Sequence, residues 1–141
     1  MVDSLVICKK VKQLAAYFQE FEEIAGKLTL ETYQGHILTK RAVEREIQLI
    51  VECATDINNM ILKKLGRGPA VDYFNSFLDL AELQVFEMEF ALKIAPSTGL
   101  RNILVHEYQK IDDGIVFQSI ANILNYYRQY LKKISEYLGC K

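Results

Sequence analysis

The chain has 141 residues, 50% of them hydrophobic and 25% charged, which is typical of one globular domain and excludes a disordered or fibrous protein. Only two prolines and seven glycines occur, so the composition favours long helices over many short strands. The formal net charge of −1 argues against an extended nucleic-acid groove, which usually carries a basic excess, but leaves room for a small site that grips one phosphate.

Apolar side chains three and four residues apart predict helices from one end of the chain to the other. A first helix is expected over residues 4–25, with Phe18 and Phe21 on its buried face. Residues 26–35 are rich in glycine and threonine and predict a loosely structured connection. The clearest pattern covers residues 43–65 and predicts a helix of about six turns, because its apolar residues keep to one face.

Two shorter helices are expected in the middle of the chain. Glycine and proline in residues 66–69 end the long helix. Residues 70–81 then predict a helix with Phe74 on its apolar face, and residues 83–94 predict another. Pro-Ser-Thr-Gly at residues 96–99 predicts an interruption or a kink before the next segment.

The last helix is expected to begin at an aspartate cap, Asp112 or Asp113, and to end at Gly139. No stretch shows the sustained alternation of apolar and polar residues that predicts a strand. The elements together predict an all-α fold, an up-and-down antiparallel bundle of four to five main helices, in a single domain of residues 1–141.

Three cysteines, Cys8, Cys53 and Cys140, are odd in number and widely separated. They form no CxxC pair and predict no disulfide framework, as suits a reducing cytoplasm. No apolar segment reaches the length of a membrane span or of the apolar region of a signal peptide. We therefore expect a cytoplasmic protein that does not act in a membrane.

Residues 101–108 predict a cluster of polar side chains on one helix. At about 100° per residue, Leu100, Ile103 and Leu104 share the face that packs on the bundle. The remaining arc carries side chains that project away from the core of the protomer: Arg101, Asn102, Val105, His106 and Tyr108. Arg101 and Tyr108 nearly eclipse each other on a continuous helix, but we expect the helix to end near His106, since continuing it would turn Glu107 towards the core.

These residue types fit phosphoryl transfer on RNA. The imidazole of His106 can take the proton of a ribose 2′-hydroxyl, and the guanidinium of Arg101 can hold the scissile phosphate, with Asn102 orienting groups around them. One histidine cannot be base and acid in one turnover, so the hypothesis requires a homodimer that brings two. On spacing alone the alternative is a solvated or capping pair. Two histidines without a cysteine or carboxylate pattern predict no metal site.

The pattern Arg, four residues, His, one residue, Tyr resembles the signature of HepT-like HEPN toxins, and Arg101, His106 and Tyr108 match it without a gap. Asn102 matches as well, and the helix of residues 41–64, with Glu44 and Arg45, is similar to the family's second helix. The resemblance implies a homodimeric, metal-independent RNase without a cofactor, which acts on mRNA or tRNA and not on DNA.

The same resemblance implies a partner, a small nucleotidyltransferase antitoxin of the MNT type. Such an antitoxin silences the toxin by transferring AMP groups to the motif tyrosine, here Tyr108, which adds bulk and phosphate charge beside Arg101. This chain lacks the Gly-Ser motif and paired aspartates of a nucleotidyltransferase, so it corresponds to the toxin. An alternative is a non-catalytic helical module that presents a substrate or nucleotide to the nucleotidyltransferase, and another is a structural adapter.

Overall fold

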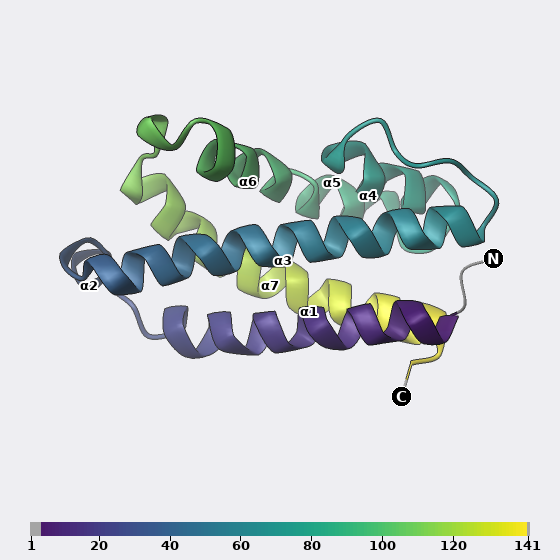
Figure 1. Cartoon of the computed structure of the whole chain (residues 1–141), viewed down its shortest axis with the longest axis horizontal. Coiled ribbons are helices and arrows are strands. Elements are labelled where there is room, and N and C mark those ends of the chain that lie inside the picture. Colours follow the sequence, from purple (N-terminus) through teal and green to yellow (C-terminus); the bar gives the residue numbers. More distant parts are fainter. Residues whose placement is uncertain (1–3, 141) are drawn as a thin grey trace.

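The computed structural model describes residues 4–140, and three long helices form its framework. These are α1 (Ser4–Ala25), α3 (Ile37–Lys64) and α7 (Asp113–Leu138). Helix α3 runs antiparallel to α1 along its length, and α7 passes behind α3 to finish beside the start of α1 (Figure 1). The start of α1 and the end of α7 therefore lie at the same end of the bundle (Figure 1).

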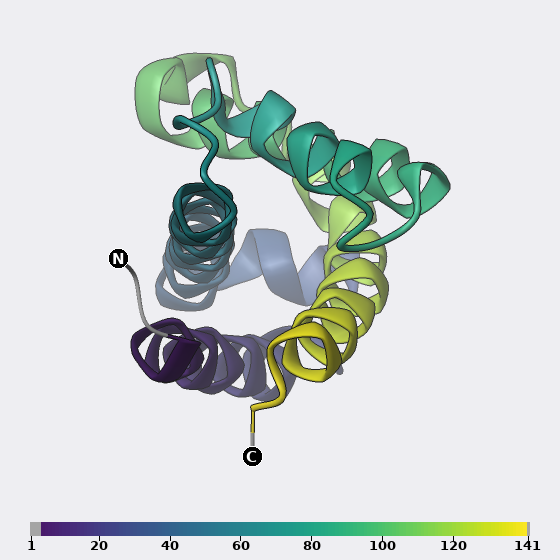
Figure 2. The ribbon, with the colours of Figure 1, turned by 90° about the vertical axis from the view of Figure 1, so that its right-hand side faces the viewer.

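The shorter helices cover the side of α3 that faces away from α1. Helices α4 (Tyr73–Glu82) and α6 (Ser97–His106) pack on α3, and α5 (Met88–Ile94) packs on α7, so the helices enclose a common interior (Figure 2). The 3₁₀ helix η1 (Tyr108–Lys110) leads from α6 into α7. Helix α2 (Leu30–Gly35) connects α1 to α3 at one end of the bundle, where it packs on α3 and α7 (Figure 1).

The predicted all-α bundle is confirmed. Residues 4–140 form helices joined by turns and contain no strand, and five of the helices have ten residues or more. The first helix has its predicted bounds, and α6 ends at His106 as expected. Asp112 caps α7 by accepting from the backbone N–H groups of Gly114 and Ile115, and Gly139 ends that helix in the left-handed conformation.

Two predictions near the start of the bundle are wrong. The expected loose connection contains α2, because the side chains of Thr29 and Thr32 each bond the other's backbone N–H in a capping box. Helix α3 begins at Ile37, earlier than the apolar pattern indicates, since its first turn is exposed and carries no core residue to mark it. Polar capping therefore forms a helix in a segment for which hydrophobic spacing predicts none.

The middle helices are also shorter than predicted. Asp72 caps α4 so that it starts at Tyr73, and Phe74, expected on the packed face, is 38% exposed. Helix α5 begins at Met88 and not near residue 83, because Gln84 adopts a φ of 64° and the N–H of Val85 bonds the carbonyl of Leu80. This is the bonding of a Schellman cap, which usually has a glycine where the chain has Gln84.

One buried hydrogen-bonded group in the core joins three helices. Asn58 of α3 donates to Ser76 Oγ of α4 at 2.9 Å and accepts from the Tyr130 hydroxyl of α7 at 2.6 Å. All three residues are fully buried. Because removing one partner leaves buried polar atoms unpaired, this group fixes how the three helices pack.

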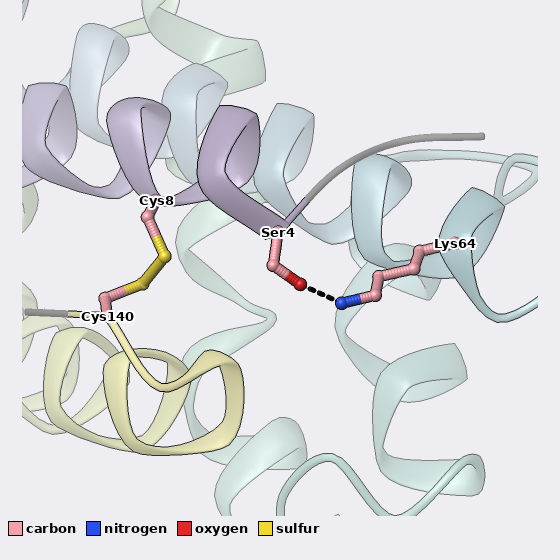
Figure 3. The surroundings of a disulfide bond; sticks show 4 residues. All are labelled: Ser4, Cys8, Lys64 and Cys140. Carbon is pink, nitrogen blue, oxygen red and sulfur yellow. Dashed lines mark hydrogen bonds between the residues drawn. A yellow bond between two sulfur atoms is a disulfide. The ribbon is translucent and has the colours of Figure 1, made fainter.

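The absence of a disulfide is a further prediction that is wrong. Cys8 of α1 and Cys140, just beyond α7, form a disulfide across 132 residues, with a Cα–Cα distance of 5.6 Å (Figure 3). Next to it Lys64 donates a hydrogen bond to Ser4, which holds the end of α3 against the start of α1 (Figure 3). Spacing along the chain does not reveal this pairing, because only the antiparallel course of the helices brings the two cysteines together. Cys53 stays free and buried.

No membrane-crossing helix is present in residues 4–140, since none combines the necessary length with the necessary apolar character.

Glu46 of α3 makes the stability of the fold depend on pH. It is 8% exposed, and burial, followed by the negative charge of Glu20, raises its pKa from 4.5 to about 7. The unfolded chain loses this proton first, so the free energy of unfolding falls as the pH rises from 4.5 to about 7. Glu46→Gln is expected to raise that free energy by about 1–3 kcal/mol at about pH 8 and to change little below about pH 4.5. Urea unfolding at both pH values measures this, and an equal gain at both would contradict it.

Candidate functional site

The candidate site lies where α6 and η1 cross one polar face of α3. Four side chains of α3 spaced four residues apart share this face: Lys40, Glu44, Gln48 and Glu52. Three of them reach across to the segment that follows. Glu52 pairs with Arg101, Glu44 with Tyr108, and Lys40 with Asp113 at 2.8 Å. This row of contacts fixes the segment of residues 101–113 on α3.

Arg101 is held by three groups at once. Its Nε and Nη2 contact Oε2 of Glu52 at 2.8 and 2.7 Å, its Nη1 donates to Oδ1 of Asn102 at 3.0 Å, and its Cζ lies 4.6 Å from the ring centroid of Tyr73. Its side chain is 14% exposed. A guanidinium has five N–H groups, so these contacts leave two of them for another anion. The arrangement orients a cation that can still bind a phosphate oxygen.

His106 is the last residue of α6 and is exposed. Its imidazole makes no hydrogen bond or ion pair with any residue in the described range 4–140. Asn102 lies one helical turn before it on the same face, and Val105 beside it is 37% exposed. The end of α6 thus presents a solvent-accessible imidazole next to an amide that is already bonded to Arg101.

Tyr108 lies in η1, where the backbone turns at Glu107 with a φ of −133°. Its hydroxyl donates to Oε1 of Glu44 at 2.7 Å, and its ring faces Cζ of Arg41 at 5.0 Å. The pKa of Tyr108 is raised to about 12, first by partial burial, then by the hydrogen bond to Glu44 and by the charge of that carboxylate. Tyr108 is 41% exposed, so its ring stays accessible while its hydroxyl is directed at α3.

The sequence prediction for this segment is partly wrong. Arg101 was expected to project away from the protomer's own core, but it turns towards α3, where Glu52 offers a carboxylate. As expected, α6 ends at His106, and η1 redirects the chain so that Tyr108 does not continue the row of Arg101. The expected exposure of Asn102 and His106 agrees with the structure.

Sequence reasoning missed the residues that hold these side chains. They come from α3 and from the start of α4: Arg41, Glu44, Glu52 and Tyr73. A signal for the α3 residues was present, since the apolar stripe of that helix leaves a second stripe of polar residues at intervals of four. Nothing in the local pattern indicates which segment that stripe meets.

Within residues 4–140, no three His, Cys, Asp or Glu side chains are grouped so that they could hold a metal ion. Lys40, Arg41 and Arg101 bring positive charge to the site.

Residues 14–134 match the family model described as Ribonuclease HepT-like. A tRNA nuclease HepT from Aphanizomenon flos-aquae is 36% identical over 140 residues, which cover 97% of this chain and 92% of that protein. An mRNA nuclease HepT from Shewanella oneidensis is 22% identical over 129 residues, or 92% of this chain and 96% of that one.

Among solved structures, a tri-AMPylated HEPN toxin of Shewanella oneidensis in complex with an MNT antitoxin superposes with a TM-score of 0.82. The sequences are 23% identical, and the match covers 96% of this chain and 99% of the toxin. The two proteins therefore share a fold.

Proposed function

The chain belongs to the HepT-like ribonuclease family, and on that basis we propose that it is the endoribonuclease toxin of a toxin–antitoxin pair. The proposed catalytic residues are Arg101 and His106, supported by Asn102, in a reaction that needs no metal ion. The observation that carries the proposal is the placement of an oriented guanidinium, with two N–H groups to spare, on the same short helix as an exposed imidazole.

In the proposed reaction the 2′-oxygen of a ribose attacks the adjacent phosphorus and the bond to the 5′-oxygen breaks. His106 takes the proton of the 2′-hydroxyl, and Arg101 binds the phosphate oxygens as their charge grows. Glu52 keeps Arg101 in position, since its carboxylate accepts two of the guanidinium N–H groups. Oδ1 of Asn102 accepts a third N–H group of Arg101, that of Nη1.

A homodimer completes this mechanism. The departing 5′-oxygen needs a proton, and one imidazole that has just accepted a proton cannot deliver another to the opposite side of the phosphorus. A two-fold dimer across the exposed end of α6 would place the imidazole of a second copy there. Val105, apolar and 37% exposed beside His106, suits such a contact.

We further propose that an MNT-type nucleotidyltransferase is the antitoxin and that it neutralises the toxin by AMPylating Tyr108. Support comes from the tri-AMPylated relative, which is bound to an antitoxin of that kind, and from the accessible ring of Tyr108. A phosphate attached at Tyr108 adds negative charge and bulk to the segment that carries Arg101 and His106, so RNA would be repelled from it.

The substrate class to test first is transfer RNA, because the relative of higher identity is a tRNA nuclease, and messenger RNA is the second. Transfer RNA and messenger RNA are both cytoplasmic, so we place the protein in the cytoplasm. The small net charge agrees with a site that grips the backbone locally and does not wrap a long RNA.

Expression of the chain alone distinguishes the toxin from a non-catalytic module that only presents Tyr108 to its partner. We expect growth arrest on induction in cells without the antitoxin, and we expect Arg101→Ala to relieve it, since the phosphate loses its cation. Arg128→Ala is the matched control, because Arg128 is a 58% exposed arginine on α7 paired with Glu22, and it should arrest growth as the wild type does. Harmless expression of the folded wild-type chain would favour the module.

A further inference from the structure

The hydroxyl of Tyr108 contacts one carboxylate, that of Glu44, and this carboxylate is almost fully buried. Glu44 is 5% exposed, and its Oε1 accepts from Tyr108 at 2.7 Å. Its Oε2 is buried near the buried hydroxyl of Tyr33, whose pKa is raised first by burial and then by the charge of Glu44, with a hydrogen bond to Glu44 as a smaller cause. Burying a carboxylate costs stability, and this one lies against the exposed Tyr108 and Arg41, which points to a use for it beyond folding.

A phenol attacks phosphorus well only when its proton is removed. The pKa of Tyr108, raised to about 12, leaves very little phenolate near neutral pH. A base must therefore take the proton as the new bond forms. Glu44 Oε1 already accepts a hydrogen bond from the Tyr108 hydroxyl, whereas the nearby Asp113 accepts one from Lys40.

We propose that Glu44 is the proton acceptor when a nucleotidyltransferase transfers a nucleotide to Tyr108, an inference that rests on the proposed function. The donor is a nucleoside triphosphate bound by that enzyme. The bond from Tyr108 Oη to the α-phosphorus forms, the bond from this phosphorus to the bridging oxygen breaks, and pyrophosphate leaves with the electron pair. The proton of Tyr108 passes to Oε1 of Glu44.

Arg41 is placed to assist at the same step. Its Cζ lies 5.0 Å from the ring centroid of Tyr108, its Nη1 lies 3.2 Å from Glu44 Oε1, and its side chain is 49% exposed. Once Glu44 is protonated, its ion pair with Arg41 weakens. The guanidinium is then available for the negative charge that grows on the α-phosphate.

The test uses the full chain, an MNT-type nucleotidyltransferase that modifies the wild type, and ATP. Glu44→Gln keeps the size and one acceptor oxygen of the side chain but cannot take up a proton. Its initial rate of modification, followed by intact mass, is expected to fall by about 10²- to 10⁴-fold. Glu46→Gln is the matched control, a second buried glutamate of α3 that lies near Glu20, and should keep the wild-type rate.

The pH dependence separates a proton acceptor from a residue that only holds Tyr108 in place. In Glu44→Gln only the phenolate reacts, so the rate should rise about tenfold per pH unit between about pH 7 and 9, far more steeply than in the wild type. Glu44→Asp keeps a carboxylate and should recover part of the rate with a shallow profile, and it carries the test if the Gln variant does not fold. A Gln variant with the wild-type rate, or with a lower rate but the wild-type pH profile, would overturn the inference.

The Tyr108→Phe variant tests the proposed AMPylation of Tyr108 separately from the role of Glu44. If the Phe variant is still modified, Tyr108 is not the acceptor, and both the proposed regulation and the role of Glu44 are wrong. If the Phe variant stays unmodified while Glu44→Gln behaves as the wild type, only the role of Glu44 is wrong.

Discussion

Replacing His106 with alanine is expected to lower the rate of RNA cleavage by about 10²- to 10⁴-fold, because the variant lacks the group that moves the proton of the 2′-hydroxyl. The fold should be unaffected, since His106 is exposed at the end of α6 and its imidazole makes no hydrogen bond or ion pair within the described range 4–140. A defect in cleavage can therefore be assigned to chemistry and not to folding.

The measurement is cleavage of purified tRNA, and of mRNA in parallel, by the isolated chain in the presence of EDTA. His36→Ala is the matched control, because it removes the other histidine of the chain, an exposed residue at the start of α3 whose side chain makes no cap bond. Full cleavage by the His106 variant would refute the assignment. Loss of wild-type cleavage in EDTA would refute metal independence.

Replacing Cys140 with serine is expected to reduce the free energy of unfolding by about 3–5 kcal/mol. The disulfide joins residues 132 apart, so removing it restores to the unfolded chain the conformational entropy of a very long loop. The native packing of α1 on α7 should remain, since both helices bury a stripe of apolar side chains while the two cysteines are only partly buried.

Urea unfolding with and without a thiol reductant measures this effect. Reductant should bring the wild type to the stability of Cys140→Ser and leave the variant unchanged, which controls for effects of the reductant elsewhere, including at the buried Cys53. If the wild type keeps its midpoint after complete reduction, the disulfide does not stabilise the fold.

Most of the fold could be predicted because hydrophobic spacing reports which face of a helix is buried. The pattern in α3 was clear since Ile47, Ile50, Ile57 and Ile61 are fully buried along one stripe. Helix α2 and the late start of α5 were missed for the opposite reason, as they depend on backbone bonds at Thr29 and Gln84 that leave no apolar pattern.

Only those features of the candidate site that depend on α6 alone could be predicted from the sequence. Helical geometry places Arg101 and His106 on one short helix, but it does not predict that the Arg101 side chain turns towards α3. The contacts of Arg101 with Glu52 and of Tyr108 with Glu44 span 49 and 64 residues, and they depend on how α6 and η1 lie on α3. Tertiary packing decides such pairs, and no local pattern encodes it.

The link between Cys8 and Cys140 also closes nearly the whole backbone into a ring. The segment between α3 and α4 is largely exposed, with Val71 at 88%, and is an accessible place for a protease to cut. One cut there would open the ring into a single linear molecule and would release no fragment. The two pieces would run together on a denaturing gel until a reductant was added, so a nicked molecule would keep α3 and α6 tethered to each other.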